Sequence, residues 1–495
     1  MKKPVFLIII LFCISITSFS QNKDGAVNLP EALSYDQIII KSCEITGNKL
    51  TKDWIIIREL DFKIGDSLAT SEIGKTVDFS MKRFAPGDSS ELSLRMKYSR
   101  ENIINTELFL TVNLSIKQIQ ENEYKLLIDV TERHYWWIFP VVKLNYPNFN
   151  EWLRDPDFSD LSMGLFFSHN NLFGSSHQTS LVGYVGKSYA VAWGYKIPWI
   201  GKGRKTGITF GAGYQNLYTV EYASAENERQ MIYKSNSLQS ANFLVNFKIR
   251  PGLYNYGNIK VTGEWVSISD SLYSLNSNYL ENNKQAITYI TFYADYAYDS
   301  RNSKTYPLMG SYLQVFVNKI GLGLISKDVD FFLYGVKMHF YQKLTERWYV
   351  AEMFKLENNS GEEMPYHYQV NLMYKKDFIR GYDLYTIKGD QMYYFRSNVK
   401  YALVQPKTKK VKEGQEKNKF KNLQYAFYVN AFADAGYVVN NFTENNPLNN
   451  DMLFSWGLGV DFVTYYDMVL RFEYAFTYNS YESKNGFFIA FGMPI

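Results

Sequence analysis

The sequence is poor in cysteine and has no long apolar run beyond its first twenty residues. It contains 2 cysteines in 495 residues, and Cys13 lies in the apolar stretch at the start of the chain. Lys2 and Lys3, the apolar run behind them and the small residues that follow predict a signal peptide over residues 1–20. The mature chain then keeps Cys43 alone, which excludes an internal disulfide.

Charge is balanced, and the motifs of common enzymes are missing. Lys and Arg number 53 against 49 Asp and Glu, a net charge of +4, and loss of two lysines with the signal peptide leaves the chain too near neutral to predict binding to nucleic acid. The 5 histidines show no metal-ligand spacing on a helix, and no G-x-S-x-G nucleophile elbow occurs. The sequence therefore predicts no enzymatic activity, no catalytic residue, no metal and no cofactor.

Aromatic residues are abundant, at 17% of the chain, and they alternate with small or polar residues. In residues 468–478, Leu470, Phe472, Tyr474, Phe476 and Tyr478 would share one face of a strand, and similar patterns occupy residues 331–341 and 454–462. Because only helices and closed barrels satisfy every backbone hydrogen bond in a bilayer, this predicts a transmembrane β-barrel over residues 134–495, of about sixteen strands. A soluble β-sandwich also alternates, but it does not usually carry aromatics on so many strands.

Residues 34–132 are more aliphatic and predict a small α+β module. Helices are expected over residues 51–60, with Thr51 as N-cap, and within residues 99–109. Strands are expected over residues 36–48, 110–120 and 124–133.

The order of these segments resembles a POTRA domain, the polypeptide-transport-associated module that precedes certain outer-membrane barrels. The residues that carry the resemblance are Gly47, Asn48, Thr51, Gly65 and Asp66. The resemblance implies one POTRA domain over residues 34–132.

The barrel region resembles the BamA/TamA/FhaC-type superfamily of outer-membrane assembly and translocation proteins, also called bacterial surface antigens. Three stretches carry this resemblance: FIRGYD (378–383), FADAG (432–436) and DSRNSKTYPLMG (299–310). In that superfamily a long loop folds back into the barrel, and its tip meets an acidic residue on the inner wall. The resemblance implies a loop-tip lock formed by Arg380, Gly381 and Tyr382, and a barrel-wall partner formed by Phe432, Asp434 and Gly436.

The local pattern supports this pairing independently. In the strand that contains residues 425–436, alternation places Phe432 and Asp434 on the lumen face, where a carboxylate needs a partner. Arginine suits that role because its planar guanidinium binds a carboxylate with two hydrogen bonds, and Gly381 permits a close backbone approach. The alternative is that Arg380 and Asp434 are separate surface or lumen charges.

The resemblance implies that the protein inserts or translocates polypeptides at the bacterial outer membrane, with its POTRA domain in the periplasm. The implied partners are the lipid bilayer, unfolded or extended client polypeptides, and periplasmic accessory proteins or lipoproteins. A weak seam between the first and last strands would admit the client. Two alternatives stay open: a passive barrel that is porin-like or binds at the surface, and lipid or protein transport of the TamA-like kind.

Overall fold

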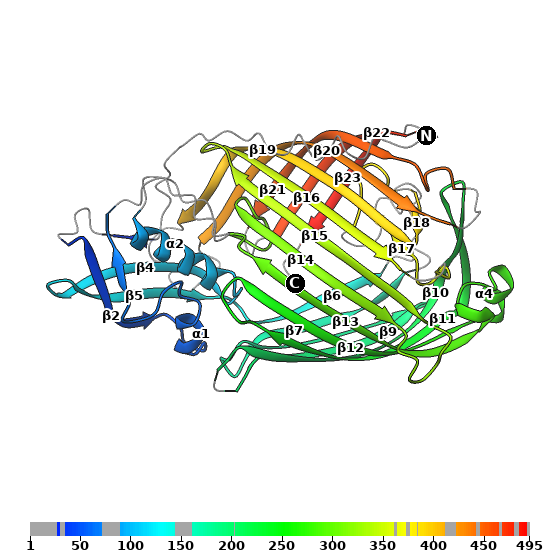
Figure 1. Cartoon of the computed structure of the whole chain (residues 1–495), viewed down its shortest axis with the longest axis horizontal. Helices are drawn as coiled ribbons and strands as arrows, with labels where there is room; N and C mark the ends of the chain where they lie inside the picture. The colour runs from blue at the N-terminus through cyan, green and yellow to red at the C-terminus, as the bar shows by residue number, and fades with distance from the viewer. Residues whose placement is uncertain are drawn as a thin grey trace.

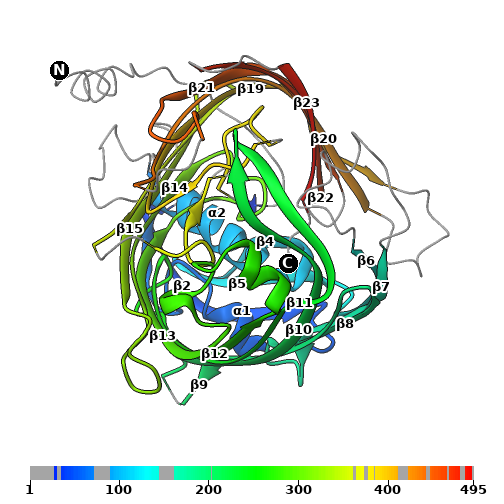
Figure 2. The ribbon, with the colours of Figure 1, turned by 90° about the vertical axis from the view of Figure 1, so that its right-hand side faces the viewer.

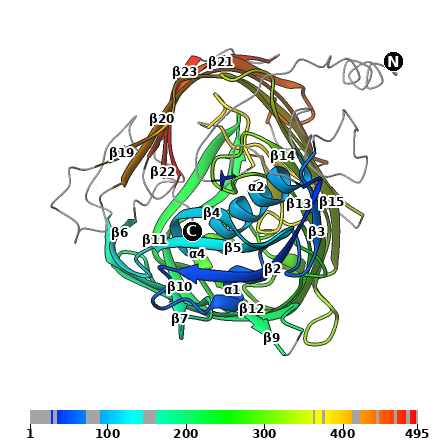
Figure 3. The ribbon, with the colours of Figure 1, turned by 90° about the vertical axis from the view of Figure 1, so that its left-hand side faces the viewer.

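The computed structural model describes residues 27–29, 35–71, 90–143, 161–201, 203–360, 364–372, 377–383, 385–410, 422–441, 446–464, 468–479 and 485–492. The predicted signal peptide lies outside these residues. The chain forms a small α+β module followed by a 16-stranded antiparallel sheet that curves into a barrel. Figure 1 shows the module at one end of this barrel, and Figure 3, viewed from that end, shows α2, β4 and β5 lying across the barrel opening.

The module is a 5-stranded sheet in the order β1-β4-β5-β2-β3. β2 runs parallel to β5, and β5 runs antiparallel to β4. Its core is aliphatic and fully buried, with Ile38 and Ile40 of β2 packed against Leu114 and Leu126. The strands are β1 (Val27–Asn28), β2 (Gln37–Thr46), β3 (Ser67–Ala69), β4 (Phe109–Gln120) and β5 (Glu123–Glu132).

Both helices of the module differ from the sequence prediction. α1 spans Asp53–Ile57, and its N-cap is Lys52 rather than Thr51. α2 spans Glu91–Ile104, whereas the predicted helical segment was residues 99–109. The helix thus begins eight residues earlier than predicted and also ends earlier. Ser90 caps α2 by accepting a hydrogen bond from the backbone N–H of Ser93. The prediction missed the first half of α2 because its apolar residues alternate as in a strand, with Leu92, Leu94, Met96 and Tyr98 all buried.

The barrel strands follow one another around the wall, each antiparallel to the next. Between β16 and β19 the chain makes a long excursion that contains two short paired strands, β17 (Val370–Asn371) and β18 (Lys388–Gly389). A short helix, α4 (Asp270–Leu275), and a 3-10 helix, η2 (Glu281–Asn283), lie between β12 and β13. The wall strands are β6 (Trp136–Lys143), β7 (Ser162–Leu172), β8 (His177–Gly186), β9 (Tyr189–Ile200), β10 (Thr206–Ala225), β11 (Glu228–Ile249), β12 (Asn255–Ile268), β13 (Ala286–Asp299), β14 (Gly310–Ile320), β15 (Phe331–Lys343), β16 (Trp348–Asn359), β19 (Gln391–Lys410), β20 (Asn422–Val439), β21 (Leu453–Thr464), β22 (Met468–Tyr478) and β23 (Asn485–Gly492).

The two faces of the wall differ as the alternation predicts. On β21, Trp456 and Leu458 are 57% and 61% exposed, whereas Ser455 and Asp461 are buried on the opposite face. On β22, Phe472 and Tyr474 are exposed and Glu473 is buried between them. An apolar outer surface and a polar inner surface are the arrangement of a barrel that contacts lipid outside and water or polar groups inside.

The first and last strands of the wall do not pair with each other. Among the described residues, β6 bonds only to β7 and β23 only to β22, so the 16-stranded sheet ends at these two strands. Every other wall strand has two hydrogen-bonded neighbours. The barrel therefore has one seam, between β6 and β23, that lacks a ladder of backbone hydrogen bonds.

At the end opposite the module, the β10–β11 hairpin extends beyond its neighbours and crosses the barrel mouth (Figure 2). Its tip bonds to two loops on the other side of the barrel. Asn227 donates its backbone N–H to Asn446 Oδ1 at 2.9 Å, and its carbonyl accepts the N–H of Thr386 at 2.8 Å. Leu448 donates its N–H to Asn227 Oδ1 at 3.1 Å. The hairpin is thus fixed across the mouth by hydrogen bonds at its tip.

Candidate functional site: a loop locked inside the barrel

The segment between β16 and β19 enters the barrel, and its tip is buried there. Arg380 is 1% exposed and Tyr382 is 0% exposed, although both belong to a long connection between strands. Ile379, Tyr385 and Ile387 of the same segment pack into an apolar cluster with Val438 and Leu453 of the wall. The segment is therefore an internal element of the barrel rather than a solvated loop.

The centre of the site is an ion pair between Arg380 and Asp434. Arg380 Nε donates to Asp434 Oδ2 at 2.7 Å, and Nη2 donates to Oδ1 at 2.5 Å. The backbone N–H of Arg380 also donates to Oδ2, at 3.2 Å. A two-point contact of this kind fixes the orientation of the loop tip as well as its position.

The remaining donors and the face of the Arg380 guanidinium are also occupied. Nη1 donates to Asn398 Oδ1 of β19 at 2.7 Å and to Glu473 Oε1 of β22 at 3.1 Å. The guanidinium carbon lies 3.7 Å from the ring centre of Phe432, which provides a cation–π contact. Arg396 Nε stands 3.8 Å from Asp434 Oδ2, so two arginines face two carboxylates and the buried charge is balanced.

The two residues that follow Arg380 fit the wall closely. Gly381 has a φ of +86°, and a Cβ there would lie 2.7 Å from Thr477 Cγ2 and 3.0 Å from Ala475 Cβ. Tyr382 places its hydroxyl 3.0 Å from the carbonyl oxygens of both Phe454 and Tyr478. A side chain at position 381 would push the tip away from β22.

The wall residues leave room for the loop. A Cβ at Gly436 would lie 2.8 Å from Ile379 Cγ1 of the loop. A Cβ at Gly457 of β21 would lie 2.6 Å from the ring of Phe432. These glycines on β20 and β21 let the loop tip and the stacked ring lie against the backbone of the wall.

The structure thus brings together all six residues that the sequence singled out for the lock and its wall partner. Sequence reasoning missed two further partners of Arg380, namely Asn398 and Glu473. Glu473 could have been found, because alternation along residues 468–478 already places it on the inner face. Asn398 carried no such signal, since an amide on a lumen face has many alternative partners.

A second connection enters the barrel from the module end, through the turn between β13 and β14. Tyr306 of this turn donates its hydroxyl to Asp461 Oδ2 of β21 at 2.7 Å, and its ring lies 5.0 Å from that of Tyr428. Lys400 Nζ stands 3.6 Å from the same carboxylate. The turn that the sequence identified by DSRNSKTYPLMG therefore contacts the opposite wall.

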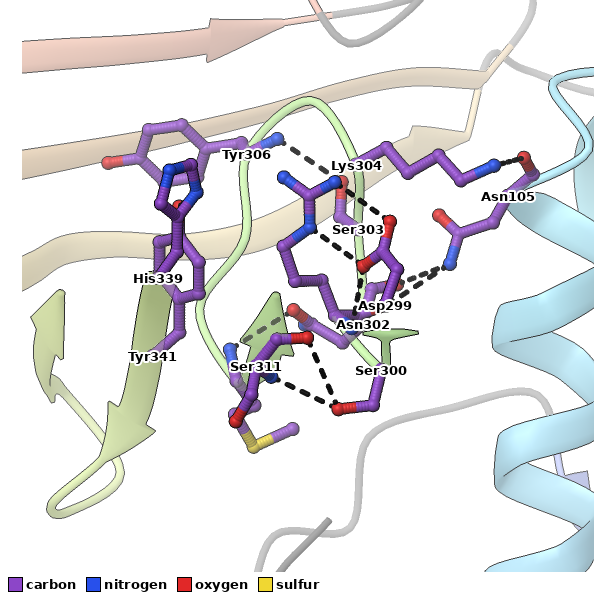
Figure 4. Close-up of polar contacts among 12 residues, drawn as sticks. Asn105, Asp299, Ser300, Asn302, Ser303, Lys304, Tyr306, Ser311, His339 and Tyr341 are labelled. Carbon is purple, nitrogen blue, oxygen red and sulfur yellow. Dashed lines mark hydrogen bonds and ion pairs between the residues drawn. The ribbon is translucent and has the colours of Figure 1, made fainter. Parts of the chain in front are cut away.

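Figure 4 shows that this turn also contacts the module. Asn105, at the end of α2, donates its side-chain amide to the carbonyl oxygens of Arg301 and Asn302, each at 3.3 Å. Lys304 Nζ donates to the carbonyl of Asn105 at 3.3 Å. Within the turn, Arg301 binds Asp299 with two hydrogen bonds of 2.8 Å. One turn therefore links the module to the barrel interior.

Direct ion pairs and ring contacts hold the module against the barrel rim. Arg250, just after β11, binds Glu59 with hydrogen bonds of 2.6 and 2.7 Å. The Arg58 guanidinium carbon lies 3.2 Å from the ring centre of Trp199 on β9, and that of Arg204 lies 4.0 Å from Trp54 of α1. Partial burial lowers the pKa of Arg58 to about 10, which leaves it charged at neutral pH.

The five residues of the POTRA resemblance occupy two places in the module. Thr51 is buried at the barrel rim, where its hydroxyl bonds to Tyr135 at 2.8 Å and accepts the amide of Asn171 at 2.9 Å. Gly47 has a φ of +87° and a Cβ there would meet Val130 O at 1.9 Å, while Asn48 donates to Asp53 at 2.7 Å beside it.

Gly65 and Asp66 lie apart from that group, at the β2 edge. Gly65 has a φ of +102°, and its N–H donates to Ile40 O at 2.8 Å. Asp66 accepts the N–H of Lys63 at 2.8 Å, which closes the turn before β3. These residues shape the module, and Thr51 alone among the five also joins it to the barrel.

The described residues offer no group of three or more His, Cys, Asp or Glu side chains placed to hold a metal ion. No described helix has the length and apolar character needed to cross a membrane. Arg380 is engaged with Asp434, Glu473 and Asn398, although Arg396 Nε beside them has no hydrogen-bond partner among the described residues. The chemistry of the centre is that of a structural fastening between a loop and a wall.

Comparison with known proteins shows what the barrel is similar to. Residues 171–412, just under half of the 495 residues, match the model of the Omp85 superfamily domain. Among solved structures, BamA from Haemophilus ducreyi lacking POTRA domains 1–3 is 14% identical over 92% of this chain and 84% of that one, with a TM-score of 0.50. CdiB from Escherichia coli is 10% identical over 96% and 92%, also with a TM-score of 0.50. No curated protein matches in sequence. At these identities the likeness shows the fold.

Proposed function

We propose that this chain, whose barrel is an Omp85 superfamily barrel, inserts or translocates polypeptides at the bacterial outer membrane. In this proposal the N-terminal module is a POTRA domain in the periplasm, and the client enters the membrane at the seam between β6 and β23. The single observation that carries the proposal is the absence of pairing between these two strands among the described residues.

An unpaired seam can template a nascent strand. Each edge strand presents backbone N–H and C=O groups with no partner from the other edge, and an extended client can bond to such an edge whatever its side chains. Over their described residues, β6 and β23 are 8 residues long each. Edges of this length could form few hydrogen bonds with each other even if they met, so little free energy would be needed to keep the seam open.

The interior lock stabilises the strands that flank this seam. Through Asn398, Asp434 and Glu473, Arg380 bonds to β19, β20 and β22, and Tyr382 lies against carbonyls of β21 and β22. β22 is the only described neighbour of β23. The lock therefore keeps β19–β22 in place on one side of the seam. Opening of the seam would then move β23 on that side, and β6 with the strands that follow it on the other side.

The module offers edges for a client before it reaches the barrel. β3 covers Gln37–Ile39 of β2 and the turn before it bonds to Ile40, so among the described residues the outer edge of β2 is open to an added strand only beyond Ile40. At the other side of the sheet, β1 pairs with only Leu114 and Ser115 of β4. Binding by β-augmentation would tolerate many client sequences and suits a factor with several clients.

The apolar outer wall supports the remaining partner, a lipid bilayer. Exposed Trp, Phe, Leu and Val side chains occupy the outward positions of many strands, as the barrel of an outer-membrane protein requires. Accessory periplasmic proteins or lipoproteins would bind the module, which lies outside the bilayer in this arrangement.

The proposal is tested by depleting the protein and quantifying the outer-membrane proteome. We expect a defined set of barrel or surface proteins to fall, and wild-type protein to restore it. Arg380→Ala should fail to restore these clients at equal abundance. Arg347→Ala, which changes an exposed arginine in the β15–β16 turn, should restore them fully.

Two results would reject the proposal. An unchanged proteome accompanied by altered permeability or surface binding would identify a passive barrel. A changed lipid composition of the outer leaflet with unchanged proteins would identify lipid transport instead.

A further inference from the structure

We propose that the inner wall formed by β9–β12 near the module holds a binding site for a small phosphate-bearing anion. This site is separate from the Arg380 lock, which contacts β19–β22. The proposal does not depend on the function proposed above.

The site is a cavity of about 250 Å³. Its polar lining comes from four neighbouring strands: Lys196, Thr209, Asn246, Lys248 and Asn258. The register places Lys196 opposite Thr209 and Thr209 opposite Asn246, so these side chains share one face. Phe243 and Phe247 of β11 are 55% and 53% exposed on the outer face, and Asn246 and Lys248 therefore point inward.

The charge at this wall is predominantly positive. Lys248 is repelled by three nearby cations, and it is attracted by the carboxylate of Asp295. The three cations are Lys196, Lys304 and Arg250. Lys304 likewise repels Lys196, against an attraction from Glu107. Asp295 already accepts hydrogen bonds from Asn258 at 3.0 and 3.2 Å and from Gln314 at 3.2 Å. Arg250 is neutralised by Glu59. Lysines of β9 and β11 therefore line the cavity, and the nearest carboxylate, that of Asp295, is already hydrogen-bonded.

Several other interior cations of this barrel have a carboxylate at ion-pair distance. Lys355 lies 2.7 Å from Glu357, Lys388 lies 2.9 Å from Glu221, and Arg301 lies 2.8 Å from Asp299. Lys196 and Lys248 make no ion pair with any described residue. Lys196 instead donates to Gln178 at 3.3 Å, and Lys248 lies 4.5 Å from the ring centre of Tyr256. Partly buried ammonium groups without a counter-ion favour binding of an anion from solution.

The donor set points to a phosphate group. Two ammonium groups, the amide of Asn246 and the hydroxyl of Thr209 face the cavity, while the Asn258 amide is already bonded to Asp295. Lysine binds phosphate as a point charge from several directions. A planar carboxylate would be served better by a guanidinium, and the nearby Arg250 is committed to Glu59. The ligand is therefore free phosphate or the phosphate of a lipid headgroup, which share the same tetrahedral oxyanion.

Binding is measured by isothermal titration calorimetry on the full-length protein in a detergent free of phosphate. Inorganic phosphate, phosphoethanolamine and sodium acetate are titrated separately. We expect phosphate or phosphoethanolamine to bind with saturation and acetate to bind at least about tenfold more weakly, since acetate offers fewer oxygens and less charge to the two lysines. Tighter binding of inorganic phosphate identifies the free ion as the ligand, and tighter binding of phosphoethanolamine identifies a headgroup.

The matched variants are Lys196→Gln with Lys248→Gln, and Lys260→Gln as control. Lys260 lies in the same register row, opposite Asn246, but does not line the cavity. The double variant should lose about tenfold or more in affinity, and the control should bind as wild type. A folded barrel migrates differently on a gel before and after heating, and this difference is checked for each variant. If the double variant does not fold, the binding measurement is made with Lys248→Gln alone. Failure of both phosphate ligands to saturate, or equal binding by the cavity variant and the control, would overturn the proposal.

Discussion

Burial of Arg380 has a cost that its partners must offset. An isolated guanidinium inside a protein loses its hydration, and the loss is recovered only when every donor finds an acceptor. Arg380 has Asp434, Glu473 and Asn398 as acceptors and the ring of Phe432 on its face. Removing one member leaves the others buried with fewer partners than they have donors or acceptors, so the group is stable as a set and fragile to single changes.

Arg380→Ala and Asp434→Ala should each destabilise the barrel by about 3–5 kcal/mol, because each leaves an uncompensated buried charge. In the double variant the two effects should fail to add by at least about 0.5 kcal/mol. Urea unfolding of the reconstituted protein, followed by tryptophan fluorescence, measures both. Arg471→Ala is the control, since Arg471 is 34% exposed and 3.7 Å from Asp461, and should cost about 1 kcal/mol or less. Additive effects would disprove the coupling.

Gly381→Ala should be more harmful than Gly323→Ala, although both glycines have positive φ. Gly323 has a φ of +67° and no atom within 4 Å of a Cβ built there, whereas Gly381 meets Thr477 Cγ2 at 2.7 Å. Gly323→Ala therefore reports backbone strain alone, about 1 kcal/mol, and Gly381→Ala adds a steric clash with β22. Unfolding midpoints of the two variants give the comparison. Equal destabilisation would show that the loop tip does not press on the wall.

Cys43 should resist alkylation in the folded protein. Partial burial, with a contribution from Asp53, raises the pKa of its thiol to about 11, so little thiolate exists near neutral pH. The folded thiol ionises at a higher pH than the unfolded one, so this site favours folding below the unfolded pKa near 9 and loses that contribution as the pH rises toward 11. Maleimide labelling between pH 7 and 10, with urea-unfolded protein as reference, tests this. Equal rates in both states would contradict it.

At the scale of elements, sequence reasoning succeeds where one physical rule dominates. Alternation with aromatics gave the strands of the wall and the inward direction of Asp434, because a lipid-facing surface leaves a strand little choice. The same rule failed for α2, whose alternating apolar residues are buried in a helix that packs against β1, β3 and β4. Thr51 was expected to cap α1, but tertiary hydrogen bonds to Tyr135 and Asn171 take its side chain instead.

Contacts between distant elements could not be read from the sequence. The bond from Tyr306 to Asp461 spans 155 positions and that from Arg250 to Glu59 spans 191. No local pattern encodes such pairs, because a turn residue or a rim charge has many sterically acceptable partners. The FIRGYD and FADAG stretches were paired only because a family resemblance supplied the long-range relation.

The Arg250–Glu59 contact should determine how firmly the module sits on the rim. Glu59→Arg should weaken docking, because it sets two cations against each other, and the exchange Glu59→Arg with Arg250→Glu should restore part of it. Hydrogen–deuterium exchange in α1 and the following turn measures docking. Protection should fall in the single variant and recover in the exchange. Unchanged protection in Glu59→Arg would show that the other contacts of the module with the rim, those of Trp199, Trp54, Thr51 and Asn105, hold it without this ion pair.

On the scale of the whole molecule, the seam is the one place where the wall can part without breaking a described ladder of strand pairs. A covalent link across it should therefore abolish client assembly. The pairs to test combine Val141→Cys with Phe488→Cys, Ile489→Cys or Ala490→Cys in turn. We expect a pair that forms a disulfide on oxidation to stop client assembly, and reduction of the disulfide to restore it.

The control link is Leu165→Cys with Gly183→Cys, which joins residues already opposite each other on β7 and β8. It should leave assembly unchanged. Full activity of a protein with a verified link between β6 and β23 would show that clients pass elsewhere.

The hairpin tip at Asn227 decides which part of the wall can move. Its hydrogen bonds to Thr386 and Asn446 fix β10 and β11 to the connections that precede β19 and β21, on the opposite side of the barrel mouth. β6–β9 lie between this hairpin and the seam, and at the module end Asn171 of β7 and Trp199 of β9 contact Thr51 and Arg58. On the function proposed above, opening of the seam would swing β6–β9 about β10 and would require these module contacts to break or to move with the strands, while the hairpin stays across the mouth.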